Sequence, residues 1–311
     1  MFESTTLLTP LQTAARLPYP ALLDAIFRLL ADDFVQVPQR LVQPLAGGGS
    51  LFVMPAMDRE VAIIKLISFT PANAQKNCGD QRLPTIQGDV VVFDIASGKR
   101  RLILDGPTVT ARRTAAVSLL AAQRLASNPQ GPLLIVGAGV QGRAHLEAFA
   151  EGLDIRQVMI ASRSPASALA LAQHALSLGL QASVVQDANA ALAACPLAVT
   201  CTPANEVVLD ALPRPDAFVA AVGAFTPAMV ELATDLCRHF AENGSVFVDT
   251  ADARHEAGDL LQAGLDARRF ATLADVLRLG IRPPAGRVLF KSCGWAGWDL
   301  AAARTALQSM P

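Results

Sequence analysis

The sequence lacks the long apolar run that a membrane-spanning helix needs. Although 52% of its 311 residues are hydrophobic, no stretch reaches the ~18 uninterrupted apolar residues that a bilayer crossing requires. The apolar segment from Thr114 to Ala126, for example, is interrupted by Arg124. The first residues, Met-Phe-Glu-Ser-Thr, also lack the basic stretch and apolar core of a secretory signal. We therefore expect a soluble, cytoplasmic protein without a membrane partner.

Net charge and clustered cysteines are also scarce. Lys and Arg total 26 and Asp and Glu total 27, so the formal net charge is −1. With no global positive field to attract a polyanion, we expect no nucleic-acid partner and look instead for a small-molecule ligand. The five cysteines form no Cys-x-x-Cys pair and the four histidines lack metal-ligand spacing, so neither a disulfide framework nor a metal site is expected.

What the middle of the chain has is an alternation of apolar runs and helical stretches rich in Ala and Leu. Strand-like runs fall at residues 133–136, 157–161, 182–185, 197–201, 218–222 and 246–248. Helical stretches lie between them, at 140–151 and, with Ser164 as a possible N-cap, at 165–178. Strands that alternate with helices predict an α/β fold with a doubly wound parallel sheet, the Rossmann architecture.

The first part of the chain has a different pattern. Strand-like runs at residues 51–54, 61–69, 88–93 and 101–104 are separated by short turns, which predicts an antiparallel or mixed sheet. A long helix over 110–127 leads to the boundary signal Asn-Pro-Gln-Gly at 128–131. A C-terminal helix over 298–308 is expected to pack back on this first part. We expect an α+β domain of residues 1–115 and 290–311, and a Rossmann domain of residues 116–289.

The strongest single motif is the turn Gly-Ala-Gly-Val-Gln-Gly at residues 137–142, between the first strand of the parallel sheet and the helix that follows. Gly137 allows the tight turn, Gly139 lets the backbone approach a pyrophosphate, and Gly142 lets helix and strand pack closely. The helix start, at Val140 and Gln141, offers free N–H groups to the phosphates. The motif in this context predicts a nicotinamide dinucleotide site and favours an oxidoreductase.

The residues after the second strand bear on the choice of cofactor. Sites specific for NAD usually carry an acidic residue there for the ribose hydroxyl, but this chain reads Ser162, Arg163 and Ser164. Arg163 could meet a 2′-phosphate, with the two serines as donors, or it could be a solvated loop cation. We expect NADPH to be preferred and NADH to be possible. Further cofactor contacts are expected at the ends of two later strands: Cys201, Thr202, Val222 and Gly223.

Four basic residues in the first part are considered as candidates for an anion site. Lys65 interrupts the apolar strand at 61–69, and it faces either a cleft or, on the half-buried strand, the solvent; periodicity leaves both open. Arg112 and Arg113 stand near the start of the long helix, where an anion could be bound. Arg40 has no local feature that separates it from a surface arginine.

Several blocks in order make the chain resemble the ornithine cyclodeaminase/μ-crystallin family over nearly its whole length. They are Val-Pro-Gln-Arg at 37–40, Phe-Val-Met-Pro at 52–55, Lys65, Thr-Ala-Arg-Arg-Thr-Ala-Ala at 110–116, the glycine turn, Ala-Val-Gly at 221–223 and Phe-Lys-Ser-Cys-Gly at 290–294. The resemblance implies a Rossmann domain joined to a domain that binds substrate and forms a homodimer. It also implies hydride transfer at carbon–nitrogen centres of amino acids.

The resemblance assigns site residues. The family's two substrate-binding arginines and its lysine match Arg40, Arg113 and Lys65, the lysine being the catalytic candidate. Arg113 is the match because the family's arginine directly precedes Thr-Ala-Ala, whereas Arg112 falls at a variable position. Thr85 stands where the family tends to place a polar contact to the substrate.

One departure separates the subfamilies. Cyclodeaminases carry an aspartate two residues after Ala-Val-Gly, where this chain has Phe225. A phenyl ring can neither take a proton nor pair with an ammonium group. We therefore expect NAD(P)H-dependent reduction of small cyclic ketimines, Δ1-pyrroline-2-carboxylate or Δ1-piperideine-2-carboxylate, to L-proline or L-pipecolate. Ornithine cyclodeaminase, alanine dehydrogenase and a non-catalytic, crystallin-like NADPH binder are the alternatives.

Overall fold

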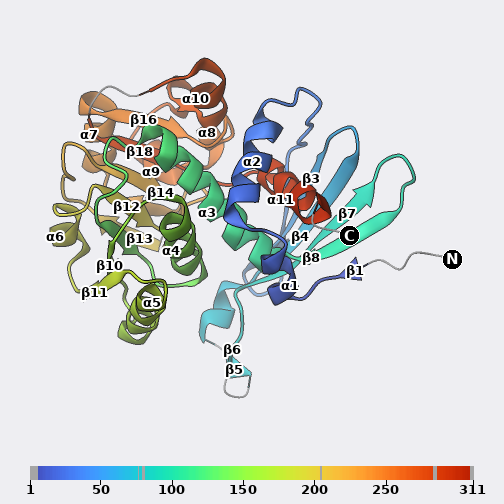
Figure 1. The fold of residues 1–311 in the computed structure, drawn as a ribbon, viewed down its shortest axis with the longest axis horizontal. Coiled ribbons are helices and arrows are strands. Elements are labelled where there is room, and N and C mark those ends of the chain that lie inside the picture. Colours follow the sequence, from blue (N-terminus) through green and yellow to red (C-terminus); the bar gives the residue numbers. More distant parts are fainter. Residues whose placement is uncertain (1–5, 76, 79–80, 204, 283–285, 309–311) are drawn as a thin grey trace. The chain divides into compact units, whose positions relative to one another are not determined.

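The computed structural model describes residues 6–75, 77–78, 81–203, 205–282 and 286–308 (Figure 1). It divides into two compact units, one made of residues 1–113 and 295–311 and the other of residues 114–294. The expected boundaries were 115/116 and 289/290, so the first differs by two residues and the second by five. Helix α3, Gly106–Leu125, carries the first boundary. Over the described ranges, no helix is both long and apolar enough to cross a membrane.

The first unit is built on a six-stranded sheet in the order β1-β8-β7-β4-β3-β2. All neighbours are antiparallel except β1 and β8, which are parallel, so the expectation of an antiparallel or mixed sheet is confirmed. Its strands are β1 Thr6–Leu7, β2 Leu41–Leu45, β3 Gly49–Met57, β4 Val61–Phe69, β7 Ile86–Asp94 and β8 Arg100–Asp105. A 3-10 turn, Pro71–Gln75, and the short pair β5 Asn77–Cys78 and β6 Gln81–Arg82 stand between β4 and β7.

Helices cover one face of this sheet. The unit's helices are α1 Pro10–Ala15, α2 Tyr19–Leu30, the start of α3 and α11 Ala296–Gln308. Helix α11 contacts β3, β4 and α2, so the prediction that the C-terminal helix packs back on the first part is confirmed. Because side chains alternate along a strand, Ile63, Lys65 and Ile67 of β4 are buried on the covered face, while Leu66 points to the other face and is exposed.

The second unit contains an eight-stranded sheet in the order β11-β10-β9-β12-β14-β18-β16-β17, and every neighbouring pair in it is parallel. The strands are β9 Leu133–Val136, β10 Gln157–Ala161, β11 Gln181–Val185, β12 Leu197–Thr200, β14 Phe218–Ala221, β16 Ser245–Val248, β17 Ala271–Thr272 and β18 Val288–Lys291. The doubly wound parallel sheet predicted from the alternation of strands and helices is thereby confirmed.

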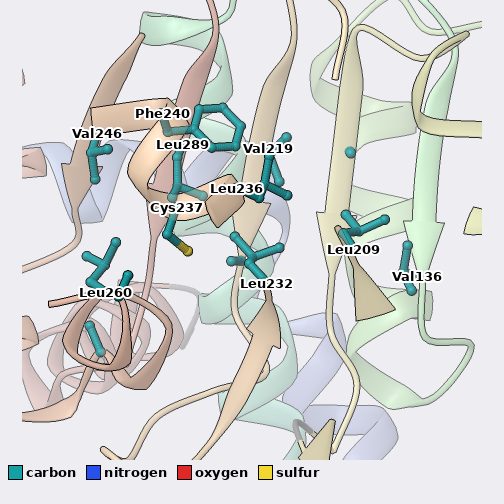
Figure 2. Packing of buried hydrophobic residues seen from close by; sticks show 14 of the residues in the cluster. Val136, Leu209, Val219, Leu232, Leu236, Cys237, Phe240, Val246, Leu260 and Leu289 are labelled. Carbon is teal, nitrogen blue, oxygen red and sulfur yellow. The ribbon is translucent and has the colours of Figure 1, made fainter. Parts of the chain in front are cut away.

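Connecting helices and two small strands complete the second unit. They are α4 Val140–Gly152, α5 Pro165–Ser177, α6 Ala188–Leu192, α7 Thr234–Asn243, α8 Ala253–Glu256, α9 Gly258–Gln262, α10 Leu273–Leu279, the 3-10 turn Ala267–Arg269, and the parallel pair β13 Asn205–Leu209 and β15 Val230–Leu232. Strands β9, β12 and β14 are buried along their whole length, which explains their continuous apolar runs. Figure 2 shows side chains of the strands and of α7 packed together in the core of this unit.

Strand β18 was not predicted as part of this sheet. It pairs with β14 on one side and β16 on the other, and its last residues, Phe290 and Lys291, lie beyond the expected boundary at 289/290. A four-residue run whose partners are about 40 and 70 residues away gives no local signal of which sheet it joins, because strand pairing in parallel sheets is set by tertiary packing.

Candidate functional site

Lys65 is buried and paired. It is 2% exposed, and its Nζ lies 3.0 Å from Oδ1 of Asp299, which is completely buried on α11. The choice left open by the sequence, between the solvent face and a buried position, is therefore resolved in favour of the covered face of β4. A buried ammonium needs such a partner because desolvation without one is costly.

Arg113 contacts the same carboxylate oxygen. Its Nε lies 3.1 Å from Asp299 Oδ1 and its side chain is 6% exposed. The neighbouring Arg112 turns elsewhere: its Nε donates to the backbone carbonyl of Leu17 and its guanidinium lies 4.1 Å from the centre of the Tyr19 ring. The structure thus brings Arg113, and not Arg112, to Lys65.

Asp299 is the residue of this cluster that sequence reasoning missed. Both cations approach Oδ1, while Oδ2 is buried and accepts no hydrogen bond from the described residues. A signal was present, since Asp299 lies between Trp298 and Leu300 in a helix that is otherwise apolar at this point. An acid in such a helix predicts a buried partner, although an acid in a first helical turn is also favoured by the helix dipole.

Arg40 adds a third positive charge to this cluster. It is half-buried just before β2, with its guanidinium 5.9 Å from the centre of the Phe52 ring. The pKa of Lys65 is lowered to about 8, chiefly by burial and further by the charges of Arg113 and Arg40, while Asp299 opposes the shift. Lys65 and Arg113 share the single carboxylate of Asp299, which leaves an excess of positive charge in a water-poor place and suits an anionic ligand.

Thr85 is half-buried directly before β7, and its backbone carbonyl accepts a hydrogen bond from the N–H of Thr70. Among the described residues, no hydrogen bond joins Thr85 to Lys65, Arg113 or Asp299. Its role toward a substrate stays a prediction.

The glycine turn has the geometry that a pyrophosphate needs. Gly137 has φ 115°, and a Cβ there would come within 2.7 Å of the Cys201 carbonyl oxygen. A Cβ at Gly142 would come within 2.0 Å of the Gly137 carbonyl oxygen, so strand and helix pack at a distance that only glycine allows. Gly139, by contrast, has no atom within 4 Å of its Cβ position, which leaves its backbone open to a ligand.

The start of α4 offers the matching donors. The helix has 13 residues, its N-cap Gly139 provides no side-chain cap, and Val140 is exposed. The first N–H groups of an α-helix have no intrahelical acceptor, so the start of α4 is a place where an anion can be bound. The residues of this turn fit a nicotinamide dinucleotide, with Gly139 to Gly142 as the candidate cradle.

Ser162, Arg163 and Ser164 follow β10 as expected. The Ser164 hydroxyl accepts from the N–H of Ser167, which confirms Ser164 as the N-cap of α5, and the Ser162 hydroxyl accepts from the N–H of Ser164. Arg163 is exposed, and its Nη1 lies 3.1 Å from Oε1 of Glu206 on β13. No local signal in the sequence connects Glu206 with this edge of the sheet.

A buried carboxylate, Glu231 of β15, holds two of the predicted cofactor residues. One oxygen accepts from the N–H and the hydroxyl of Thr202 at 2.7 and 2.9 Å, and the other accepts from the N–H of Gly223 at 2.7 Å and from the hydroxyl of Thr200 at 2.9 Å. The chain after β12 and the chain after β14 are thereby tied to one side chain. The other two predicted cofactor residues are positioned by backbone hydrogen bonds. The Cys201 N–H donates to the Val136 carbonyl, and the Val222 N–H donates to the Thr200 carbonyl.

A second buried ion pair supports Glu231. Asp259 accepts from the backbone N–H groups of Glu231 and Leu232 and pairs with Lys291 Nζ at 2.9 Å, and Lys291 also donates to the Ala221 carbonyl. Burial raises the pKa of Glu231, although the Lys291 charge and the Thr202 donors oppose the shift. Burial alone would lower the pKa of Lys291, but the negative charges around it, Asp259 first, outweigh burial and raise it.

Phe225 packs partly buried against the hydrophobic core of the second unit. It stands two residues after Ala-Val-Gly and brings no titratable group to that position.

The comparisons with known proteins agree with the fold. A family model for the ornithine cyclodeaminase/mu-crystallin family matches residues 17–310. The chain belongs to this family. It is 40% identical over 303 residues to Delta(1)-pyrroline-2-carboxylate reductase 2 of Burkholderia ambifaria, with 96% of this chain and 94% of the relative covered. It is 32% identical over 314 residues to the ketimine reductase mu-crystallin of Mus musculus, covering 99% and 93%.

A solved structure shares the fold. The Delta(1)-pyrroline-2-carboxylate reductase of Thermococcus litoralis, in complex with NADH and L-proline, superposes with a TM-score of 0.84 at 24% identity, covering 97% of this chain and 93% of that one.

Proposed function

We propose that this protein is an NAD(P)H-dependent oxidoreductase that reduces small cyclic ketimines carrying a carboxylate beside the C=N bond. The substrates are Δ1-pyrroline-2-carboxylate and Δ1-piperideine-2-carboxylate, and the products are L-proline and L-pipecolate. The observation that carries the proposal is the buried cluster of Lys65, Arg113 and Asp299, with Arg40 beside it. The names of the 40% identical relatives support the same reaction.

The excess of positive charge binds the substrate carboxylate. Arg113 and Arg40 supply charge-assisted hydrogen bonds that fix the orientation of the ring. Asp299 keeps Arg113 and Lys65 in place through Oδ1, so the cations are held before a substrate arrives. This preorganisation lowers the entropic cost of binding.

Lys65 supplies the proton side of the chemistry. With its pKa lowered to about 8, it carries a proton at neutral pH and releases it more readily than an exposed lysine does. It holds the substrate carboxylate or keeps the imine nitrogen protonated. The carbon of a protonated C=N bond accepts hydride more readily than the carbon of a neutral imine. A bound nicotinamide supplies the hydride.

NADPH is the preferred cofactor in this proposal and NADH a possible one. Support comes from Arg163, which follows β10 where a 2′-phosphate would need a cation, and from the glycine turn, which fits the pyrophosphate. Thr202 and Gly223, held by Glu231, contribute the contacts near the nicotinamide.

Individual residues argue against two of the alternative functions, ornithine cyclodeamination and non-catalytic binding. Ornithine cyclodeamination needs an acid where Phe225 packs into the core. Alanine dehydrogenation is distinguished from ketimine reduction by the substrate panel below. A non-catalytic, crystallin-like binder would have no reason to keep Lys65 buried with a lowered pKa among other cations.

We further propose a homodimer formed through the uncovered face of the six-stranded sheet. Leu66 is 37% exposed there, and Val53, Ile64, Val91 and Ile103 are half-buried neighbours on the same face. A group of apolar side chains on a sheet face that no helix covers suits an interface between two copies of the chain. Light scattering after gel filtration tests it: Leu66→Glu should yield a monomer, whereas Leu279→Glu, at an exposed leucine on α10, should leave the dimer intact. A monomeric unmodified protein would contradict it.

A substrate panel tests the reaction. Oxidation of NADPH and of NADH is followed separately with the five- and six-membered cyclic ketimines and with pyruvate plus ammonia, and NAD reduction is followed with ornithine. Turnover of the ketimines, with chiral analysis giving the L-product, is expected. Turnover with ornithine alone would overturn the proposal.

A further inference from the structure

The segment that follows β10 contains no acidic residue, but the fold brings an acidic side chain from another strand next to it. Arg163 is the second residue after β10, and β10 is the second strand of the β9–α4–β10 unit that contains the glycine turn. Its guanidinium Nη1 lies 3.1 Å from Oε1 of Glu206, the second residue of β13. In dinucleotide-binding folds, residues at the end of this second strand recognise the ribose 2′ position.

The sequence favours NADPH because residues 161–164, at the end of β10, contain no acidic side chain. Tertiary structure supplies that acid from 43 residues further along the chain. Both side chains of the pair are largely exposed, at 70% for Arg163 and 62% for Glu206, so separating them to accommodate a ligand would break no buried ion pair. An exposed pair of this kind contributes little to stability.

We propose that Glu206 is the residue that limits the preference of this protein for NADPH over NADH. Arg163 attracts the 2′-phosphate, while Glu206 repels it and offers an acceptor to the 2′-hydroxyl of NADH. The two side chains together make a site that tolerates both cofactors. The inference rests on the cofactor site proposed above, with the adenosine ribose at the end of β10.

The charges set the expected size of the effect. A phosphate monoester carries about −1.5 to −2 charges at neutral pH. A phosphate bound to Arg163 would lie roughly 6 Å from the Glu206 carboxylate if that carboxylate stayed near its present position. At such a distance in a solvent-exposed site, repulsion corresponds to a change of about fivefold in the dissociation constant. The loss of an acceptor for the 2′-hydroxyl acts in the same direction on the ratio of the two cofactors.

The experiment measures dissociation constants by fluorescence titration, for NADPH and NADH, without any imino acid. The variants are Glu206→Gln, Arg163→Gln and the double variant. Asp235→Asn is the matched control, because Asp235 forms another exposed ion pair of the same unit, 3.4 Å from Arg238 on α7. Fragments that end at the ribose, ADP-ribose and its 2′-phosphate, are titrated in parallel to isolate the 2′ position.

For Glu206→Gln we expect the preference for NADPH over NADH to rise about fivefold to tenfold, with the same shift for the two fragments. Arg163→Gln should lower the preference about tenfold, and Asp235→Asn should leave it unchanged. A preference that stays within about twofold in Glu206→Gln would overturn the proposal. Weaker NADPH binding in that variant would also overturn it, since Glu206 would then orient Arg163 toward the phosphate.

The same titration separates this inference from the proposed reaction. Binding of both dinucleotides with an unchanged preference in Glu206→Gln contradicts only the role of Glu206. If the unmodified protein binds neither dinucleotide, the proposed function fails, and the role of Glu206 fails with it.

Discussion

Each unit of this protein contains a fully buried lysine paired with an aspartate, and the two pairs behave in opposite ways. Lys65 lies 3.0 Å from Asp299 in the first unit, and Lys291 lies 2.9 Å from Asp259 in the second. The pKa of Lys65 is lowered to about 8, whereas the pKa of Lys291 is raised. Distance and burial are nearly the same, so the difference comes from what surrounds each pair.

The sign of the neighbouring charge decides the direction. The charges of Arg113 and Arg40 lower the pKa of Lys65, and Lys65 and Arg113 share one carboxylate, so this pair of cations is only partly neutralised by Asp299. Glu231 stands near Lys291, so that pair has an excess of carboxylate, which hydrogen-bond donors satisfy. The first arrangement stays incomplete without an anion, and the second is complete by itself. We therefore interpret the first as a binding and reaction site and the second as a support for the cofactor residues.

The largest expected effect comes from removing a cation of the incomplete cluster. Arg113→Ala should lower kcat/KM for the cyclic ketimine by about three orders of magnitude, because a buried charge-assisted contact to the carboxylate is lost. Steady-state kinetics at saturating NADPH measures it.

The neighbouring residue provides the control. Arg112→Ala removes the contacts with Leu17 and Tyr19 and should lower thermal stability, but it should change kcat/KM by no more than about threefold. Near-normal turnover in Arg113→Ala would show that this cluster does not bind the carboxylate.

The two lysines should differ most clearly in stability. Lys291→Met leaves Asp259 buried without its cation and should cost about 3–5 kcal/mol of unfolding free energy. Lys65→Met removes a surplus cation while Arg113 still pairs with Asp299, so stability should be unchanged or rise by about 1 kcal/mol as activity falls. Urea unfolding of both variants, together with kcat/KM, measures the contrast.

Equal losses of stability in the two variants would contradict the distinction between the two pairs. Retained activity in Lys65→Met would contradict the role of the lysine in the reaction.

The pH dependence gives a smaller and more specific effect. If protonated Lys65 is required, kcat/KM should fall as pH rises through about 8, where the folded protein releases this proton. Asp299 raises the pKa of Lys65, so Asp299→Asn should move the fall to lower pH, by about one unit.

Comparing the variant with the unmodified protein on the same substrate removes the titration of the substrate itself. A limb that moves to higher pH, or does not move, would be inconsistent with Asp299 acting through Lys65.

Local patterns were sufficient for most elements of the fold. Continuous apolar runs between helices identified β9, β12 and β14, because strands buried on both faces have no polar alternation to obscure them. Strand β18 was not predicted, and the expected boundary at 289/290 cuts through it, since its partners β14 and β16 are distant in sequence.

Only part of the candidate site could be predicted from the sequence, because its other residues have partners that are distant in the chain. Lys65 and the glycine turn stand out locally, as a charge in an apolar strand and as glycines between a strand and a helix. Asp299 contacts Lys65, Glu206 contacts Arg163 and Glu231 contacts Thr202, across 234, 43 and 29 residues of sequence. The residues around each of these acids do not predict its partner, because the contact forms only when distant parts of the chain pack together.

The most direct test of the account compares a ketimine that has the carboxylate with one that lacks it. kcat/KM with NADPH is measured for Δ1-pyrroline-2-carboxylate and for 1-pyrroline, in the unmodified protein and in Arg113→Gln. We predict a preference of at least about a thousandfold for the carboxylated ring in the unmodified protein, and its near-complete loss in the variant. The same preference in both proteins would contradict the claim that the surplus cations around Asp299 bind the carboxylate of the imine that is reduced.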